Sequence, residues 1–234
     1  MITACHLGPT PYAEGLCLQE ALVGAVADRR TGDWLLFPDH PPVLTVGRGG
    51  APGGLVADRA MLAERGIEIF DVARGGDITW HGPGQLVGYA ICDLTRGRDL
   101  HRFLRGHESA LIDVLAGYGI EGTKVEGRTG VWVGERKIAS LGIAVRRWVS
   151  YHGFALNVAP DLRFFELIHP CGLRGVRMTS VADLLGAGAP ALAEVRERAA
   201  QAVARRLDLG DVRWVGREAV LEAAREAATA VAVR

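Results

Sequence analysis

The order of apolar and polar residues along the chain predicts helices and short strands in an irregular succession. Residues 12–30 carry Leu16, Val23 and Ala27 at helical spacing and therefore predict a helix. Further helices are predicted at 57–65, at 99–118, at 190–206 and from 216 to the end. Thr179 and Ser180 predict the N-terminal cap of another, short helix that ends at Leu185. Strands are predicted at 33–37, 43–47, 68–73, 86–91, 130–148, 149–158 and 212–215. Residues 160–170 read as irregular or briefly helical.

These elements favour an α/β (α+β) fold in which helices pack on one mixed sheet. The strands outnumber what strict β-α-β alternation allows, and a Gly134-Glu135 turn splits residues 130–148 into a hairpin. The length of 234 residues fits a single domain. We expect a core at 1–185 and an extension at 190–234 packed on it, joined by the glycine- and alanine-rich residues 186–190.

Composition narrows the class of protein. Hydrophobic residues make up 49% of the chain and the formal net charge is zero, which argues against disorder and against a nucleic-acid or membrane-surface partner. No apolar run is long enough to span a bilayer, and the first residues do not resemble a secretory signal. We therefore expect a cytoplasmic protein whose four cysteines, Cys5, Cys17, Cys92 and Cys171, are free thiols. The histidine spacing predicts no metal site.

The most informative segment is RGGDITWHGPGQLVGY at residues 74–89. Its first glycines let backbone N–H groups approach a ligand beside a fixed positive charge. A second turn at Gly82-Pro83-Gly84 then leads into an apolar strand. Two turns that flank Thr79, Trp80 and His81 indicate the wall of a pocket.

Two other residues, Cys171 and Lys137, stand out from the other residues of their type in the sequence. Cys171 follows a proline and precedes a glycine, whereas the other cysteines lie in apolar helix-like or strand-like contexts. Only two of the 27 basic residues, Lys124 and Lys137, are lysines. Because the chain uses arginine for almost every permanent positive charge, a remaining lysine is suited to a role in which the side chain loses its proton. Lys124 is also a remaining lysine, however, and the sequence gives it no evident role.

Three segments together resemble the lipoyl(octanoyl) transferases of lipoate synthesis: residues 74–89, KIASLGI at 137–143 and HPCGL at 169–173. With YHGFALNV at 151–158, the resemblance covers most of residues 1–185 in the family's order. It implies the catalytic fold of biotin and lipoate protein ligases. It also implies that Cys171 is a nucleophile that carries the acyl group as a thioester, with Lys137 as general acid and base.

The resemblance further implies the partners and the substrate contacts. The donor would be octanoyl-acyl carrier protein, and the acceptor a lysine of lipoyl domains, in 2-oxoacid dehydrogenase E2 subunits and the glycine cleavage H protein. No cofactor is implied. The residues that match the family's substrate-contacting segments are Arg74, Gly75, Gly76, Asp77, Ile78, Thr79, Trp80, His81, Ser140, Leu141, Gly142, Gly153, Phe154 and Ala155.

The sequence leaves several alternatives open. Thr79 and His81 either orient the thioester carbonyl or order the loop. His152 is interpreted as a hydrogen-bonded residue of the sheet, and Lys137 is preferred to His169 as the residue that activates Cys171. Backbone N–H groups at 75–76, 141–142 or 171–172 are candidates to stabilise an oxyanion. One rival function is an ATP-dependent lipoate or biotin ligase of the same fold, and another is a non-catalytic protein that binds acyl carriers.

Overall fold

A computed structural model describes residues 1–50, 53–95, 97–169 and 176–232. The strands are β1 Ile2–Pro9, β2 Trp34–Asp39, β3 Val43–Val46, β4 Glu68–Asp71, β5 Ile78–His81, β6 Gln85–Ile91, β7 Thr123–Val125, β8 Arg128–Val133, β9 Arg136–Arg146, β10 Val149–Asn157, β11 Arg177–Met178 and β12 Val212–Trp214. The helices are α1 Tyr12–Ala27, α2 Arg59–Glu64, α3 Leu100–Ala116, α4 Val181–Leu185, α5 Leu192–Arg206 and α6 Arg217–Ala232, with 3₁₀ turns at Leu162–Leu167 and Gly186–Gly188.

The larger of two sheets runs through the middle of the molecule. Its strands in the described chain follow the order β12-β1-β2-β6-β10-β9-β8-β7, and β11 pairs with β9. β1 is parallel to both of its neighbours, and β11 is parallel to β9, whereas the pairings from β2 through β6, β10 and β9 to β8 are antiparallel. The sheet is therefore mixed, as the sequence predicts.

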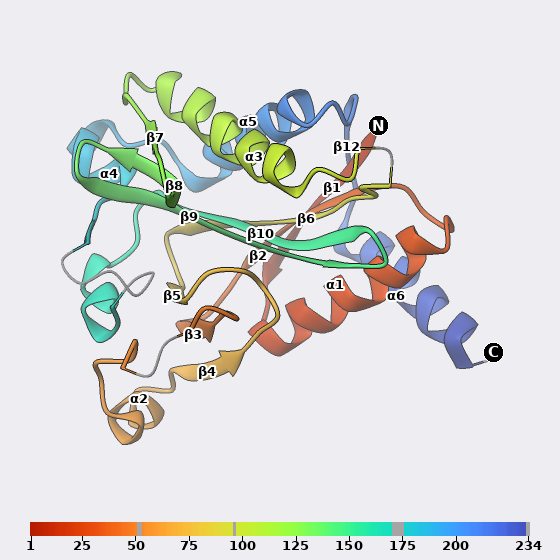
Figure 1. Ribbon diagram of the computed structural model, residues 1–234, viewed down its shortest axis with the longest axis horizontal. Helices are drawn as coiled ribbons and strands as arrows, with labels where there is room; N and C mark the ends of the chain where they lie inside the picture. The colour runs from red at the N-terminus through yellow and green to blue at the C-terminus, as the bar shows by residue number, and fades with distance from the viewer. Residues whose placement is uncertain (51–52, 96, 170–175, 233–234) are drawn as a thin grey trace.

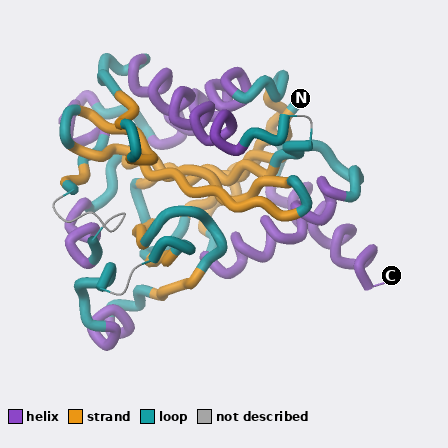
Figure 2. Tube along the Cα trace, in the orientation of Figure 1, coloured by secondary structure: helices purple, strands orange, loops and turns teal. Residues whose placement is uncertain are grey.

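Helices cover both faces of this sheet (Figures 1 and 2). α3 and α5 lie on one face and bury an apolar cluster that includes Leu111, Val203 and Leu156. α1 and α6 lie on the other face, over a second cluster that includes Leu22 and Val220. Each helix buries one apolar side against the sheet, which is the usual way in which such a core forms.

A second sheet covers the rest of the face on which α1 and α6 lie. It has the order β4-β3-β5 and packs with α2 around its own apolar cluster, which contains Leu44, Leu62 and Trp80. The predicted extension also joins the larger structure, because β12 pairs with β1 at the edge of the main sheet. No helix in the described chain combines the length and apolarity needed to cross a bilayer.

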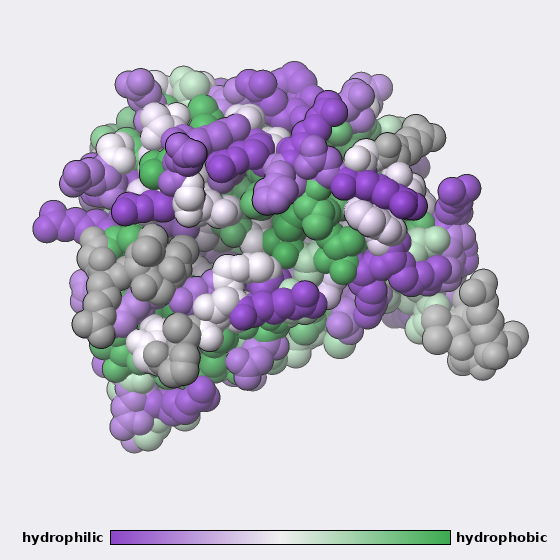
Figure 3. Space-filling model, in the orientation of Figure 1, coloured by the Kyte–Doolittle hydropathy of each residue, from purple (hydrophilic) through white to green (hydrophobic). Residues whose placement is uncertain are grey.

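The surface on the face shown in Figure 3 is polar around its margin, and apolar side chains gather near its middle, over the large sheet. The small sheet lies below the large sheet in this view, and the segment that joins β4 to β5 runs between them (Figure 1). That segment contains residues 74–77, the start of the glycine-rich run. The fold therefore brings the predicted pocket wall against the centre of the main sheet.

Candidate active site

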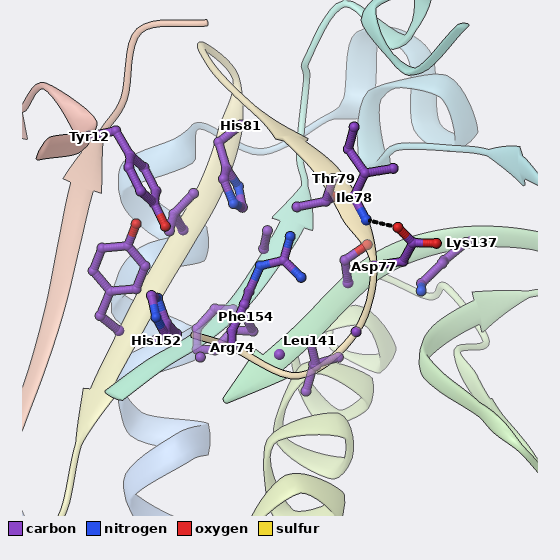
Figure 4. Close-up of a pocket in the computed structure, with 17 residues that line it drawn as sticks. Tyr12, Arg74, Asp77, Ile78, Thr79, His81, Lys137, Leu141, His152 and Phe154 are labelled. Carbon is purple, nitrogen blue, oxygen red and sulfur yellow. Dashed lines mark hydrogen bonds between the residues drawn. The ribbon is translucent and has the colours of Figure 1, made fainter. Parts of the chain in front are cut away.

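A cavity lies where the segment from residue 74 to the end of β5 crosses β6, β9 and β10 (Figure 4). The predicted residues that line it are Arg74, Gly76, Asp77, Ile78, Thr79, His81, Lys137, Ser140, Leu141, Gly142, Gly153, Phe154 and Ala155. They come from three separate segments of the chain, 74–81, 137–142 and 153–155, so the fold brings most of the predicted site together.

Gly75 and Trp80 are not among the residues that line this cavity. The N–H of Gly75 donates to the carbonyl of Ile143 at 2.9 Å, which ties the segment to β9. Trp80 is fully buried in the small sheet's core, where its ring stacks on Phe164 with centroids 5.0 Å apart. Both residues hold the cavity wall in place without facing the cavity.

Arg74 supplies a buried positive charge at the cavity. Its Nη2 donates to the carbonyl and to the hydroxyl of Thr45 at 2.7 and 2.8 Å, and its Nη1 donates to the carbonyl of Gly75 at 3.1 Å. The guanidinium is therefore fixed by backbone and hydroxyl oxygens of β3 and of its own loop. Its charge also helps to keep His81 and His152 unprotonated.

Lys137 is buried and its Nζ is held in one direction. Nζ donates to the carbonyl of Thr129 at 2.9 Å and lies 5.6 Å from the centre of the Trp132 ring. The N–H of the same peptide unit, that of Gly130, donates to the buried carboxylate of Glu108 at 2.9 Å. Glu108 thus fixes the peptide whose carbonyl positions Lys137.

Replacing Gly130 by alanine should impair both folding and the placement of Lys137. A Cβ there would lie 2.5 Å from Cε of Lys137 and 2.6 Å from the carbonyl of Ala139, at a φ of +137°. We expect a loss of about 1–3 kcal/mol in unfolding free energy and a fall in turnover. Gly127→Ala is the control, because Gly127 also has a positive φ but open space. If Gly127→Ala lowered turnover as much, the contact with Lys137 would not be the cause.

A chain of amides connects His81 to the backbone beside Lys137. Nε2 of Gln85 donates to the carbonyl of Trp80 and to Oδ1 of Asn157, and Nδ2 of Asn157 donates to the carbonyl of Thr179. Oε1 of Gln85 must therefore accept from Nδ1–H of His81, at 2.7 Å. The neutral ring then has only a lone pair at Nε2 and cannot donate to a carbonyl. Of the two roles that the sequence leaves open for His81, this network favours ordering the loop.

Four further residues, Tyr12, Val87, Tyr89 and His152, line the cavity and are absent from the predicted set. Tyr12 begins α1, at a position that helical periodicity explains without invoking a ligand. Tyr89 and His152 are polar groups within fully buried strands. In the sequence, the corresponding signal is a polar side chain within an apolar, strand-like run.

Two glycines of the site allow backbone segments of the cavity wall to approach each other closely. A Cβ on Gly142 would lie 2.6 Å from the carbonyl of Gly75. A Cβ on Gly153 would lie 2.2 Å from the carbonyl of Gly88 on the neighbouring strand. Both glycines thus permit close packing of backbone on backbone.

The cysteines in the described chain differ from one another in exposure. Cys5 and Cys92 are buried, and burial raises the pKa of Cys5 to about 11 and that of Cys92 well above its usual range. Both are therefore poor nucleophiles. Cys17 is exposed on α1 and does not line the cavity. Cys171 lies outside the described residues, and so the predicted Cys171–Lys137 pair stays a prediction.

Three buried histidines predict that the protein loses stability in mild acid. Burial lowers the pKa of His81 to about 3 and those of His107 and His152 to about 4, against 6.5 ordinarily. Below pH 6.5 these three histidines become protonated in the unfolded chain but stay neutral in the native state. Stability is therefore complete above that pH and falls as the pH drops from 6.5 towards 4, by up to about 1.4 kcal/mol per unit for each histidine.

Urea denaturation at pH 7.5 and at pH 5.0 measures this loss. The variant His107→Leu removes one of the three contributions and should show a shallower dependence than the wild type. A midpoint that stays constant between the two pH values would contradict the assignment of neutral buried imidazoles.

Comparison with known proteins places this chain in a family. The family model of the lipoyl protein ligase A/B catalytic domain matches residues 11–204. An octanoyltransferase of Solibacter usitatus is 48% identical over 204 residues, which cover 87% of this chain and 91% of the relative. Another, of Geobacter sulfurreducens, is 48% identical over 181 residues, which cover 77% of this chain and 74% of the relative. The chain belongs to the octanoyltransferase family. It is accordingly an acyltransferase, as the sequence resemblance predicts.

Solved structures confirm the fold of this octanoyltransferase-family chain. A lipoate-protein ligase of Thermoplasma acidophilum superposes with a TM-score of 0.74 at 20% identity, covering 97% of this chain and 94% of that one. A biotin protein ligase of Aquifex aeolicus gives a TM-score of 0.52 at 11% identity, covering 89% and 70%. The predicted ligase-like catalytic fold is therefore correct.

Proposed function

We propose that this protein transfers an octanoyl or lipoyl group from acyl carrier protein to a lysine of lipoyl domains, in the cytoplasm. The acceptors would be the lipoyl domains of 2-oxoacid dehydrogenase E2 subunits and the glycine cleavage H protein. The observation that carries the proposal is the buried Lys137, held at one end of a cavity whose lining includes Leu141, Phe154 and Ala155. Relatives that are named octanoyltransferase support the same assignment.

In the first half-reaction the thiolate of Cys171 attacks the carbonyl carbon of the octanoyl thioester. The new C–S bond forms as the bond to the carrier's sulfur breaks, and the carrier leaves as a thiol after it receives a proton. Lys137 takes the proton of Cys171 and returns it to the departing sulfur. A lysine suits this task because its amine can both accept and release a proton, which arginine cannot do.

In the second half-reaction the ε-amine of the acceptor lysine attacks the acyl-enzyme. An amide bond forms, the bond to Sγ of Cys171 breaks, and Lys137 receives the proton that the amine loses. The net result is one amide formed, one thioester consumed and the enzyme regenerated. Because the energy comes from the donor thioester, the reaction needs no ATP, and this separates it from a ligase of the same fold.

The test uses the purified full chain with octanoyl-acyl carrier protein and a lipoyl domain, without ATP. We expect the lipoyl domain to gain the mass of one octanoyl group, and the enzyme alone with donor to gain the same mass on Cys171. Cys171→Ala should abolish both. An adduct on the exposed Cys17, or transfer only when ATP and free octanoate are supplied, would refute the proposal. Binding of the carrier without any transfer would instead support the non-catalytic alternative.

A further inference from the structure

Polar side chains gather at the end of the cavity that lies away from Lys137. In Figure 4, Tyr12 and His152 lie at one side and Lys137 at the other. His152 pairs with Ile143, six residues beyond Lys137 along β9, which corresponds to about 20 Å at the usual rise of a strand. An acyl chain whose carbonyl lies near Lys137 would therefore point its methyl end towards His152.

The hydroxyl groups at this end already have partners. Nδ1 of His40 donates to the carbonyl of Thr10 at 2.7 Å, so Nε2 of this neutral ring accepts from the hydroxyl of Tyr89 at 2.6 Å. The oxygen of Tyr89 is in turn hydrogen-bonded to the hydroxyl of Tyr12. The chain of donors and acceptors from Thr10 to Tyr12 is thus accounted for.

His152 differs from these residues. The residue is only 2% exposed, and within the described residues its Nε2 has no hydrogen-bond partner. Burial, assisted by the charge of Arg74, lowers its pKa to about 4, so the ring is neutral. A buried polar atom of this kind is costly unless a ligand or a small polar molecule satisfies it.

The backbone holds His152 in this position at some cost. Its φ is +60°, in the left-handed region that residues other than glycine rarely adopt. Its N–H donates to Oε1 of Gln19 on α1 at 2.7 Å, which stabilises the unusual conformation. Strain of this kind is typical of functional sites.

We propose that His152 sets the upper limit on the length of the acyl chain that the cavity accepts. A medium chain ends short of the imidazole. A longer chain has to press methylene groups against a rigidly held polar ring with which they cannot form a hydrogen bond. The inference rests on the proposed function, because it takes the cavity as the acyl site and the carbonyl end to lie near Lys137.

The test compares the affinity of the full chain for octanoate and dodecanoate by titration calorimetry. Leucine in place of His152 offers longer chains an apolar surface. We expect His152→Leu to lower the ratio of the dodecanoate to the octanoate dissociation constant by at least about tenfold. A ratio within one variant is insensitive to any general loss of stability. Tyr12→Phe, which removes one hydroxyl at the same end, should shift the ratio in the same direction by a smaller factor.

The matched control is His107→Leu. His107 is also fully buried, its Nε2 also has no hydrogen-bond partner in the described chain, and its pKa is likewise about 4. It lies on α3 and does not line the cavity, so its replacement should leave the ratio unchanged. An unchanged ratio in His152→Leu, or an equal change in His107→Leu, would overturn the inference.

The same titrations separate this inference from the proposed function. If the wild type binds octanoate selectively and His152→Leu shifts the ratio but no acyl group is transferred, the proposed function fails and the inference stands. If transfer occurs and the ratio does not respond to His152→Leu, the inference alone fails. If the wild type binds neither acid, the cavity is not an acyl site and both are wrong.

Discussion

Replacing Lys137 by arginine should reduce octanoyl transfer by at least about 100-fold, which is the lower end of what a general acid and base contributes. Arginine keeps the positive charge but cannot release its proton near neutral pH. The neutral and similarly long Lys137→Met should lose as much activity. Turnover is measured from the mass of the lipoyl domain, and the stability of each variant is measured by urea denaturation. Together the two measurements distinguish a loss of proton transfer from a loss of folding.

The only other lysine provides a matched control. Lys124 is exposed, and its Nζ donates to the carbonyl of Arg105 and to the hydroxyl of Ser109. Lys124→Arg should therefore retain wild-type turnover. Near-native activity in a stable Lys137→Arg would mean that the buried ammonium acts only as a fixed charge, and the proposed proton transfer would be incorrect.

Much of the fold is predictable because helices and hairpins are determined by local sequence. The predicted helix at 190–206 corresponds to α5, Leu192–Arg206, and the predicted cap Ser180 accepts from the N–H of Asp183 at the start of α4. β1 is not predicted, because all but three of its residues are buried and no alternation marks it as a strand. Its position between β2 and β12 depends on pairing with distant segments, which periodicity does not reveal.

The candidate site shows the same division between local and distant information. Residues 74–81 and Lys137 could be singled out from their sequence, since a glycine run and a rare lysine are visible there. Glu108 could not, because its role depends on a contact between α3 and the N–H of Gly130 on β8. The contacts of Tyr12 with His81 and of His40 with Tyr89 likewise join segments that are distant in the sequence, so no local pattern reveals them.

Replacing Gly142 by alanine should disrupt the cavity wall and reduce transfer by about 100-fold, the cost typical of a small displacement of a substrate-positioning group. The new methyl carbon would lie 2.6 Å from the carbonyl of Gly75 and 3.0 Å from Cδ of Arg74. The loop must therefore move off β9, breaking the hydrogen bond from Gly75 to Ile143. Such overpacking should also cost about 1–3 kcal/mol of stability, measurable by urea denaturation.

Gly24→Ala is the control for this substitution, because Gly24 lies within α1 and has nothing within 4 Å of its added Cβ. Alanine there should keep full turnover and leave stability unchanged or raised by up to about 1 kcal/mol, since glycine is a poor helix former. If Gly142→Ala retained wild-type transfer, the loop would not need to lie against β9. Residues 74–77 would then be no rigid part of the site, and the fixed position of Arg74 would not matter for the reaction.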